Sequence, residues 1–447
     1  MDAVLSFSIR HRWLVMLFVL GLVGLGVWKF TNLPIDAVPD ITNVQVQINT
    51  SAPGYSPLET EQRITFPVET AMGGLPKLDY TRSTSRYGLS QVIVVFNEGT
   101  DIYFARQLVN ERIQQVKDQL PAGVETTMGP ISTGLGEIYS YTVEAKPGAR
   151  APDGREYTAT ELRTVQDWVI KPQMRTVPGV IEVNTVGGFD RQFHVLPDPG
   201  RLIAYKLGFR DVMRALAENN ANVGAGYIER NGEQYLVRTP GQVANKEEIR
   251  DIVIGSRGGI PVRIRDVAEV KEGPNLRTGA ATVDGKETVL GTTLLLAGEN
   301  SQTVAQRVAA KLAEVSKLLP EGIIARTVYD RTKLVEATVA TVEKNLIEGA
   351  ILVVVVLFLI LGNLRAAIVT ACVIPLAMLM TITGMVEAKI SANLMSLGAI
   401  DFGIIIDGAV IIVENCLRLL AEEQHRRGRL LSLPERLTAI REGSHEV

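Results

Sequence analysis

Three carboxylates stand in a stretch that is otherwise almost wholly apolar. They are Asp401, Asp407 and Glu414, in the segment DFGIIIDGAVIIVEN (401 to 415). Acidic side chains are costly inside a membrane span, and those that occur there usually carry protons or ions. On a helix, Asp407 and Glu414 project within ~20° of one face, whereas Asp401 is rotated by ~120° from Asp407. Two carboxylates close together in a low-dielectric medium repel each other, so we expect one of the pair to hold a proton, as a proton relay requires.

The triplet DFG (401 to 403) also occurs in protein kinases, where its Asp binds Mg²⁺. A kinase would also need a Gly-rich nucleotide loop after a strand and an HRD-type catalytic loop upstream. The sequence contains neither, so its context excludes a kinase. A structural role is the remaining alternative for each of the three carboxylates, which could face the cytoplasm, a water-filled crevice or a cation on another helix.

Candidate metal ligands are few between residues 31 and 337. This segment has no cysteine and one histidine, His194, and a lone His on a strand is more often structural than a ligand. Two carboxylates remain as candidate cation ligands, Glu137 in STGLGEIYS and Asp167 in TVQDWVIKP. The glycines before Glu137 would make the backbone compliant, as a substrate loop requires. Surface exposure without a role is the alternative for both carboxylates.

Composition indicates a membrane protein. The 447-residue chain has a formal net charge of −3 and a mean hydropathy of +0.15, with its apolar residues gathered in blocks. Nucleic acid is not an expected partner, because its binding normally shows as a clustered basic excess. Both cysteines, Cys372 and Cys416, lie in apolar blocks and cannot form a disulfide framework.

Four segments are apolar over the roughly 20 residues that a bilayer crossing takes. The first lacks a small-residue cleavage site, so we predict an uncleaved anchor rather than a signal peptide. Basic residues mark one side of the membrane as cytoplasmic, at Arg10, Arg12, Arg365 and in RLLAEEQHRRGR (418 to 429). The predicted limits are 1–11 for a cytoplasmic N-terminus, 12–31, 338–364, 366–387 and 394–420 for the spans, and 421–447 for a cytoplasmic amphipathic segment.

A repeated plan organises the long segment between the first two spans. Residues 102–128 and 301–328 each predict a helix, a Pro-x-Gly stop and a strand, and 161–186 is a weaker copy. With the strands expected before the helices, this plan predicts an α+β domain of two ferredoxin-like (βαββαβ) units and a strand-rich insertion. The predicted limits are 32–134 for the first unit, 135–180 with 275–330 for the second, and 181–274 for the insertion, with hairpins at 230–234 and 256–262. A generic α+β receptor domain is the alternative.

Several long motifs resemble those of resistance-nodulation-division (RND) exporters. They are NLPIDAVPDITNVQVQI (32 to 48), APGYSPLETEQRITFPVETAMGGLP (52 to 76), GNLRAAIVTACVIPLAML (362 to 379) and DGAVIIVEN (407 to 415). Multidrug members typically carry two adjacent aspartates where this chain has Asp407 and Gly408. Asp401 followed by this pair is similar to the heavy-metal-efflux, CzcA-type (cobalt-zinc-cadmium) branch. Copper and silver members usually place methionines in the fourth span, which here contains only Met395.

The resemblance implies a proton-driven antiporter of divalent cations such as zinc, with no cofactor and no enzymatic activity. It implies a homotrimer in the bacterial inner membrane, multi-pass, with a large periplasmic domain of two porter subdomains and an inserted docking subdomain. A periplasmic adaptor, an outer-membrane channel and the C-terminal half of the same pump would be its partners, since the chain resembles only the N-terminal half. Asp401, Asp407 and Glu414 would form the proton relay, and Glu137 and Asp167 would line the cation path.

Two other functions stay open at this point. The first is an exporter of copper, silver or hydrophobic drugs with the same architecture. The second is a membrane-anchored sensor or assembly factor, whose spans would tolerate the loss of the three acids.

Overall fold

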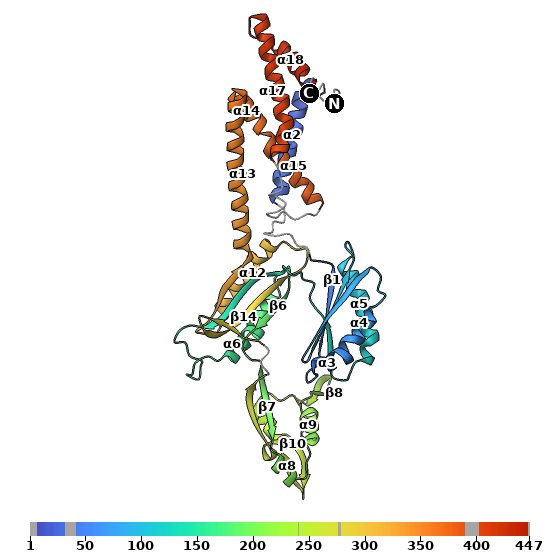
Figure 1. Ribbon diagram of the computed structural model, residues 1–447. Coiled ribbons are helices and arrows are strands. Elements are labelled where there is room, and N and C mark those ends of the chain that lie inside the picture. Colours follow the sequence, from blue (N-terminus) through green and yellow to red (C-terminus); the bar gives the residue numbers. More distant parts are fainter. Residues whose placement is uncertain (1–6, 32–41, 240, 276–278, 389–401, 446–447) are drawn as a thin grey trace.

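The protein is elongated, with a helical bundle, a pair of α+β units and an inserted unit arranged in that order along its long axis (Figure 1). A computed structural model describes residues 7–31, 42–239, 241–275, 279–388 and 402–445. A bundle of helices lies at one end, two sheets with their helices lie side by side beneath it, and an inserted unit lies at the other end. The first predicted carboxylate, Asp401, and part of the predicted fourth span lie outside the described residues.

The first α+β unit is a four-stranded antiparallel sheet in the order β2-β3-β1-β4. This order, with helices after β1 and β3, is that of a βαββαβ unit. Apolar residues alternate along the strands, and the helices pack on the face that they form, so that Val92 and Phe96 meet Val109 in one core. The elements are β1 (Gln45–Ser51), α3 (Pro57–Thr60), η1 (Glu61–Thr65), α4 (Phe66–Met72), β2 (Leu78–Arg86), β3 (Leu89–Phe96), α5 (Ile102–Val116), η2 (Lys117–Gln119) and β4 (Glu125–Met128).

The second unit has the same strand plan, β6-β14-β5-β15, with β13 added beside β14. Its core contains the buried ring of Tyr141 on β5. Tyr141 stands opposite Gly291 on the neighbouring strand β14, and its ring lies against that glycine. A Cβ at position 291 would lie 2.5 Å from the Tyr141 ring, so only glycine fits there. The elements are β5 (Glu137–Ala145), α6 (Ala159–Val165), η3 (Gln166–Ile170), α7 (Lys171–Met174), β6 (Val180–Val186), β13 (Ala281–Val283), β14 (Lys286–Leu295), α12 (Ser301–Val315), η4 (Ser316–Leu318) and β15 (Ile323–Asp330).

The first helix is built in the same way in both units. Each begins at a capping box, at Ser56 in the first unit and Thr158 in the second, and each contains one π-helical turn. Each π turn is followed by a proline, Pro67 in one helix and Pro172 in the other. The residue four positions before each proline, Arg63 or Trp168, lies within the π turn. Proline lacks an N–H and clashes with the carbonyl four residues earlier, so a wider turn at that point relieves the clash.

The inserted unit is entered and left through paired strands. β7 (Arg191–Pro197) runs antiparallel to β12 (Ala268–Pro274), and between them lies a separate core around Val212, Ile249 and Ile264. Both predicted hairpins are present, and positive φ angles at Asn231-Gly232 and Gly258-Gly259 form their turns. The other elements are α8 (Pro199–Ala204), α9 (Phe209–Glu218), β8 (Val223–Arg230), β9 (Glu233–Thr239), α10 (Lys246–Asp251), β10 (Val253–Arg257), β11 (Ile260–Arg263) and α11 (Ile264–Val267).

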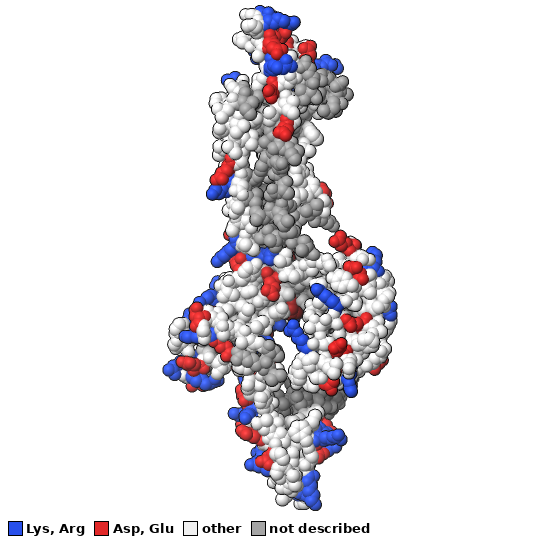
Figure 2. All heavy atoms as spheres, viewed as in Figure 1, with Lys and Arg blue, Asp and Glu red and all other residues white. Residues whose placement is uncertain are grey.

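The helical bundle contains two helices, among the described residues, that are long and apolar enough to cross a membrane. They are Arg12–Phe30 and Leu364–Glu387, the second of which comprises α14 and α15, with mean hydropathies of 2.0 and 2.2. The other two predicted spans lie in α13 and α17 and stay predictions. On the face shown in Figure 2, few of the described side chains along the middle of the bundle are charged. The helices are α2 (Arg12–Thr31), α13 (Arg331–Leu361), α14 (Leu364–Ala371), α15 (Val373–Glu387), α17 (Phe402–Arg427) and α18 (Leu433–His445).

Two features of the bundle follow directly from the sequence. α13 starts immediately after β15, where Asp330 caps it, so one helix of 31 residues joins the second sheet to the bundle. The helix begins at Arg331, before the predicted start of the span at residue 338. α14 ends at Ala371, whose carbonyl is the one that the ring of Pro375 obstructs, and this explains the break before α15.

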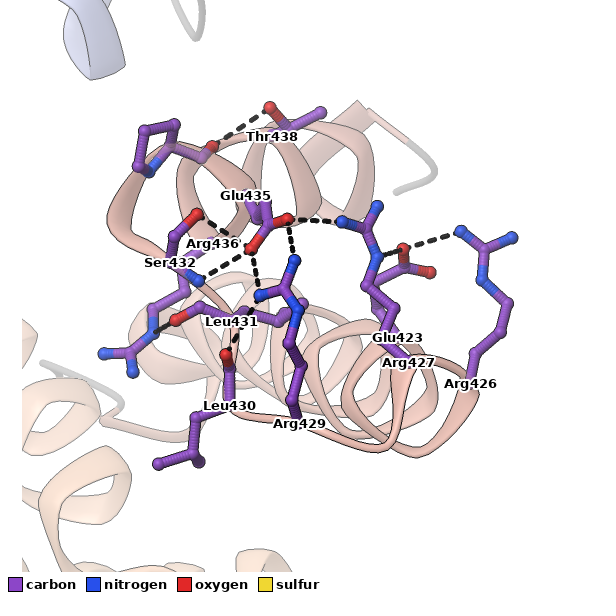
Figure 3. Close-up of polar contacts among 11 residues, drawn as sticks. Glu423, Arg426, Arg427, Arg429, Leu430, Leu431, Ser432, Glu435, Arg436 and Thr438 are labelled. Carbon is purple, nitrogen blue, oxygen red and sulfur yellow. Dashed lines mark hydrogen bonds and ion pairs between the residues drawn. The ribbon is translucent and has the colours of Figure 1, made fainter.

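The chain reverses direction after α17, at Gly428, and α18 packs against α17. Asn415 Nδ2 donates to the Gly443 carbonyl at 2.8 Å, and the helices approach closely at position 443, where a Cβ would lie 3.2 Å from Cys416 Cα. α18 therefore occupies part of the segment predicted to be amphipathic. Its first turn is closed by Glu435, which accepts bonds from Ser432, Arg427 and Arg429 (Figure 3). The Arg429 side chain, with the Ser432 amide and hydroxyl, holds the pKa of Glu435 well below its usual range.

Candidate functional site

Asp407 and Glu414 lie on one continuous helix, α17, and both are exposed in this chain. Within the described part of the chain, neither carboxylate has a cation within 4.0 Å. An adjacent face of the helix is packed, since Val410 meets Leu357 and Ile374. No atom of the described residues lies within 4 Å of a Cβ built at Gly408, so they leave the surface beside Asp407 open. The two carboxylates therefore share a face that the other described helices leave uncovered.

Glu137 is the first residue of β5 and its side chain is exposed. Among the described residues it has no ion pair or hydrogen-bonded partner for its carboxylate. The loop before it is tightly constrained rather than compliant: a Cβ at Gly136 would lie 2.0 Å from Ser132 Oγ, and the Gly136 carbonyl accepts from Leu295 N at 2.7 Å. The loop thus presents Glu137 from a fixed edge of the second sheet.

Arg331 ties this loop to the helix that enters the bundle. Its guanidinium is almost fully buried, with 4% of the residue exposed, and Nη1 donates to the Leu135 carbonyl at 3.2 Å. A movement of α13 would therefore act on the backbone two residues before Glu137. Sequence reasoning missed this residue, although its place directly after the capping residue Asp330 was a usable signal.

Asp167 lies in the π turn η3 and is already engaged. Thr185 Oγ1 on β6 donates to it at 2.8 Å, and it forms an ion pair with Arg163, whose Nη1 also donates to the Gly187 carbonyl at 3.0 Å. Burial raises the pKa of the neighbouring Tyr141 phenol, and the charge of Asp167 acts in the same direction. A cation at Asp167 would first have to displace Arg163.

The structure does not bring Glu137 and Asp167 together. Glu137 stands opposite Leu294 on β14, whereas Thr185, the partner of Asp167, stands opposite Gly291. Three residues along a strand correspond to roughly 10 Å. The part of the chain that the structure describes contains no group of three or more His, Cys, Asp or Glu side chains placed to hold a metal ion. Any cation site at Glu137 would therefore need further ligands.

Comparison with known proteins gives a match along the whole chain. Residues 4–447 match the family described as AcrB/AcrD/AcrF. The chain is 66% identical to Protein HelA of Legionella pneumophila over 447 residues, which is all of this chain and 42% of that protein. It is 63% identical over 439 residues to the Cobalt-zinc-cadmium resistance protein CzcA of Cupriavidus metallidurans, covering 98% of this chain and 41% of that protein. Identity to the Cation efflux system protein CusA of Escherichia coli (strain K12) is 37%, covering 94% of this chain and 40% of that protein.

A solved structure has the same fold. The crystal structure of a heavy metal efflux pump, crystal form II, matches with a TM-score of 0.85 at 36% sequence identity, covering 98% of this chain and 42% of that one. The chain thus spans about two-fifths of the length of the relatives that it matches.

Proposed function

The chain belongs to the AcrB/AcrD/AcrF family, and on that basis we propose that it is the N-terminal half of a proton-driven exporter of divalent heavy-metal cations of the zinc, cobalt and cadmium class. The observation that carries the choice of substrate is the gradient of identity among relatives. It is 63% to a cobalt-zinc-cadmium resistance protein and 37% to CusA, each over nearly the whole chain. The absence of a second aspartate at Gly408 supports the same choice over a multidrug exporter.

Asp407 and Glu414 would form the proton relay, with Asp401 as a further acidic group of the same segment. Exposed carboxylates on an apolar helix are costly against lipid, so their shared face has to meet other protein or a water-filled path. The remainder of a longer pump, which the relatives possess, would supply that cover. Inside such a covered space, the binding and release of protons at Asp407 and Glu414 can be coupled to a change in how α17 packs.

α13 would carry that change to the cation path. It joins the second sheet to the bundle without a break, and Arg331 at its first turn holds the backbone beside Glu137. Glu137 has no partner among the described residues and could bind a cation, whereas Asp167 would need to exchange Arg163 for one. Both remain candidate residues of the path, with Glu137 the better placed.

The proposed assembly is a homotrimer in the bacterial inner membrane with a large periplasmic domain and four spans in this chain. The two βαββαβ units would be its porter subdomains. The insertion, 181–274, would be the docking subdomain that meets a periplasmic adaptor or an outer-membrane channel.

Metal uptake into everted membrane vesicles tests the choice of substrate. Vesicles from cells producing the complete transporter would be given an inward-acidic pH gradient and then zinc, cobalt, cadmium, copper, silver or a lipophilic dye. We expect gradient-dependent uptake of zinc, cobalt or cadmium that collapses when a protonophore is added. Uptake restricted to copper and silver, or to the dye, would replace this proposal with one of the two alternative exporters. Absence of uptake for every substrate would favour the sensor or assembly factor.

A further inference from the structure

An open pocket of about 750 Å³ lies at the end of the bundle far from the sheets, between the start of α2 and α18. Its wall is rich in basic side chains, which come from two parts of the sequence more than 400 residues apart. They are Arg10, His11 and Arg12 before and at the start of α2, and Arg441 on α18. No acidic residue lines the pocket within the described chain.

The three arginines of the pocket differ from the other arginines nearby. Arg426 and Arg427 on α17, and Arg429 after it, each pair with a glutamate within 4.0 Å (Figure 3). Arg418 on α17 likewise pairs with Glu422. Among the described residues, Arg10, Arg12 and Arg441 have no such carboxylate. Like charges that converge on one pocket repel, and an anion placed between them relieves the repulsion. The pocket is therefore complementary to a negatively charged group.

The surface beside the pocket is apolar. Trp13 and Leu14 begin the apolar helix Arg12–Phe30, and 74% and 57% of their surfaces are exposed. Tryptophan is enriched where a membrane meets water, because its ring is apolar and its N–H is polar. A ligand at this place would meet cations on the water side and an apolar helix on the other side.

We propose that this pocket binds the phosphate headgroup of an anionic phospholipid, whose acyl chains lie along the first turns of α2. The bound lipid would bridge α2 and α18, since its phosphate is held by arginines of both. The proposal does not depend on which cation the protein transports, so it can fail or hold separately from the proposed function.

Trp13 provides a local probe of the bound lipid. The complete transporter carrying Trp28→Phe and Trp168→Phe, with any tryptophans beyond this chain also replaced by Phe, would be reconstituted in phosphatidylcholine vesicles with phosphatidylglycerol as the minor lipid. Bromine on the acyl chains of one lipid or the other quenches nearby tryptophan. We expect brominated phosphatidylglycerol to quench Trp13 well beyond its share of the membrane. Equal quenching by both lipids at equal mole fraction would overturn the proposal.

Single substitutions then test the pocket itself. Arg441→Gln and Arg10→Gln should each weaken the preference for phosphatidylglycerol about fivefold, because one arginine near a membrane surface contributes about a factor of five to the binding of an anionic lipid. Arg12 is left in place because its guanidinium lies 5.9 Å from the Trp13 ring and its loss would itself alter the emission. Arg365→Gln is the matched control, an exposed arginine in the first turn of α14 and outside the pocket. A loss with Arg365→Gln as large as that with Arg441→Gln would indicate general surface attraction and contradict a pocket.

Two further measurements remove the remaining ambiguities. Unchanged quenching by brominated phosphatidylcholine in every variant shows that insertion is intact, and a variant that fails this check is replaced by Arg441→Lys, which should retain the preference. Inorganic phosphate is then added to the transporter in pure phosphatidylcholine vesicles. The melting temperature of the transporter would be compared with phosphate and with phosphatidylglycerol. An equal rise with both would assign the pocket to a free anion and overturn the lipid proposal.

Discussion

Asp407 and Glu414 lie two helical turns apart on α17, within ~20° of one face, and neither has a cationic partner among the described residues. An adjacent face of the same helix is packed through Val410, so the carboxylates stand at the border between covered and uncovered surface. This arrangement is unfavourable for a helix that only anchors a domain. It is suited to a helix that exchanges protons with a second set of spans.

Glu137 and Asp167 should respond differently to loss of charge. Asp167→Asn removes the partner of Arg163 and is expected to lower the free energy of unfolding by about 1–3 kcal/mol. Glu137→Gln removes an exposed, unpaired carboxylate and should leave the melting temperature unchanged while reducing zinc uptake into vesicles. Thermal unfolding and uptake measured on both variants provide the comparison. A destabilised Glu137→Gln would mean that this carboxylate has a structural partner.

Gly24 and Gly26 on α2 form a matched pair for the packing of the bundle. A Cβ at Gly26 would lie 2.7 Å from Leu379 Cβ on α15, whereas no described atom lies within 4 Å of a Cβ at Gly24. Gly26→Ala should therefore destabilise by about 1–3 kcal/mol through overpacking. Gly24→Ala should stabilise by roughly 0.5–1 kcal/mol, because alanine loses less backbone entropy in a helix. Equal melting temperatures for the two variants in detergent would exclude the close approach of α2 and α15.

Glu435 should make the first turn of α18 sensitive to acid. Because the pKa of its carboxyl is lowered in the folded chain, its contribution is complete above the ordinary glutamate value of ~4.3 and declines as the pH falls below it. Hydrogen exchange in this turn, corrected for intrinsic rates, should be equally slow at neutral and mildly acidic pH and then accelerate. Glu435→Gln should accelerate it already at neutral pH, and Glu442→Gln, an exposed residue on the same helix, should not. Identical exchange in both variants would show that the arginines do not hold this turn.

Local signals in the sequence predicted much of the α+β domain. Alternating apolar residues and Pro-x-Gly stops located α5, α12 and their strands, and Asn-Gly and Gly-Gly pairs located both hairpins, because these residues adopt positive φ readily. A helix was expected in 161–186, but its likeness to the first helix of the first unit was not predicted. The two helices share a capping box and a proline but few other residues, and the π turn between them has no simple sequence signal.

Contacts that depend on packing could not be predicted from spacing. The engagement of Asp167 by Thr185 depends on which strand lies beneath η3, and the contact of Arg331 with Leu135 joins residues 196 positions apart. Lys29 at the end of α2 and Glu387 at the end of α15, whose Nζ and Oε1 lie 2.5 Å apart, are a further example. Helical periodicity alone was sufficient to place Asp407 and Glu414 on one face, because both lie on the single helix α17.

Zinc-dependent proton flux in the Asp407→Asn variant tests the central proposal most directly. The complete transporter would be reconstituted in vesicles that contain a pH indicator, beside Glu422→Gln, a control on the same helix whose carboxylate pairs with Arg418. We expect Asp407→Asn to abolish the proton flux that zinc elicits while insertion and zinc binding remain, and Glu422→Gln to retain it. Undiminished flux in Asp407→Asn would contradict the role of this face of α17 as a proton relay.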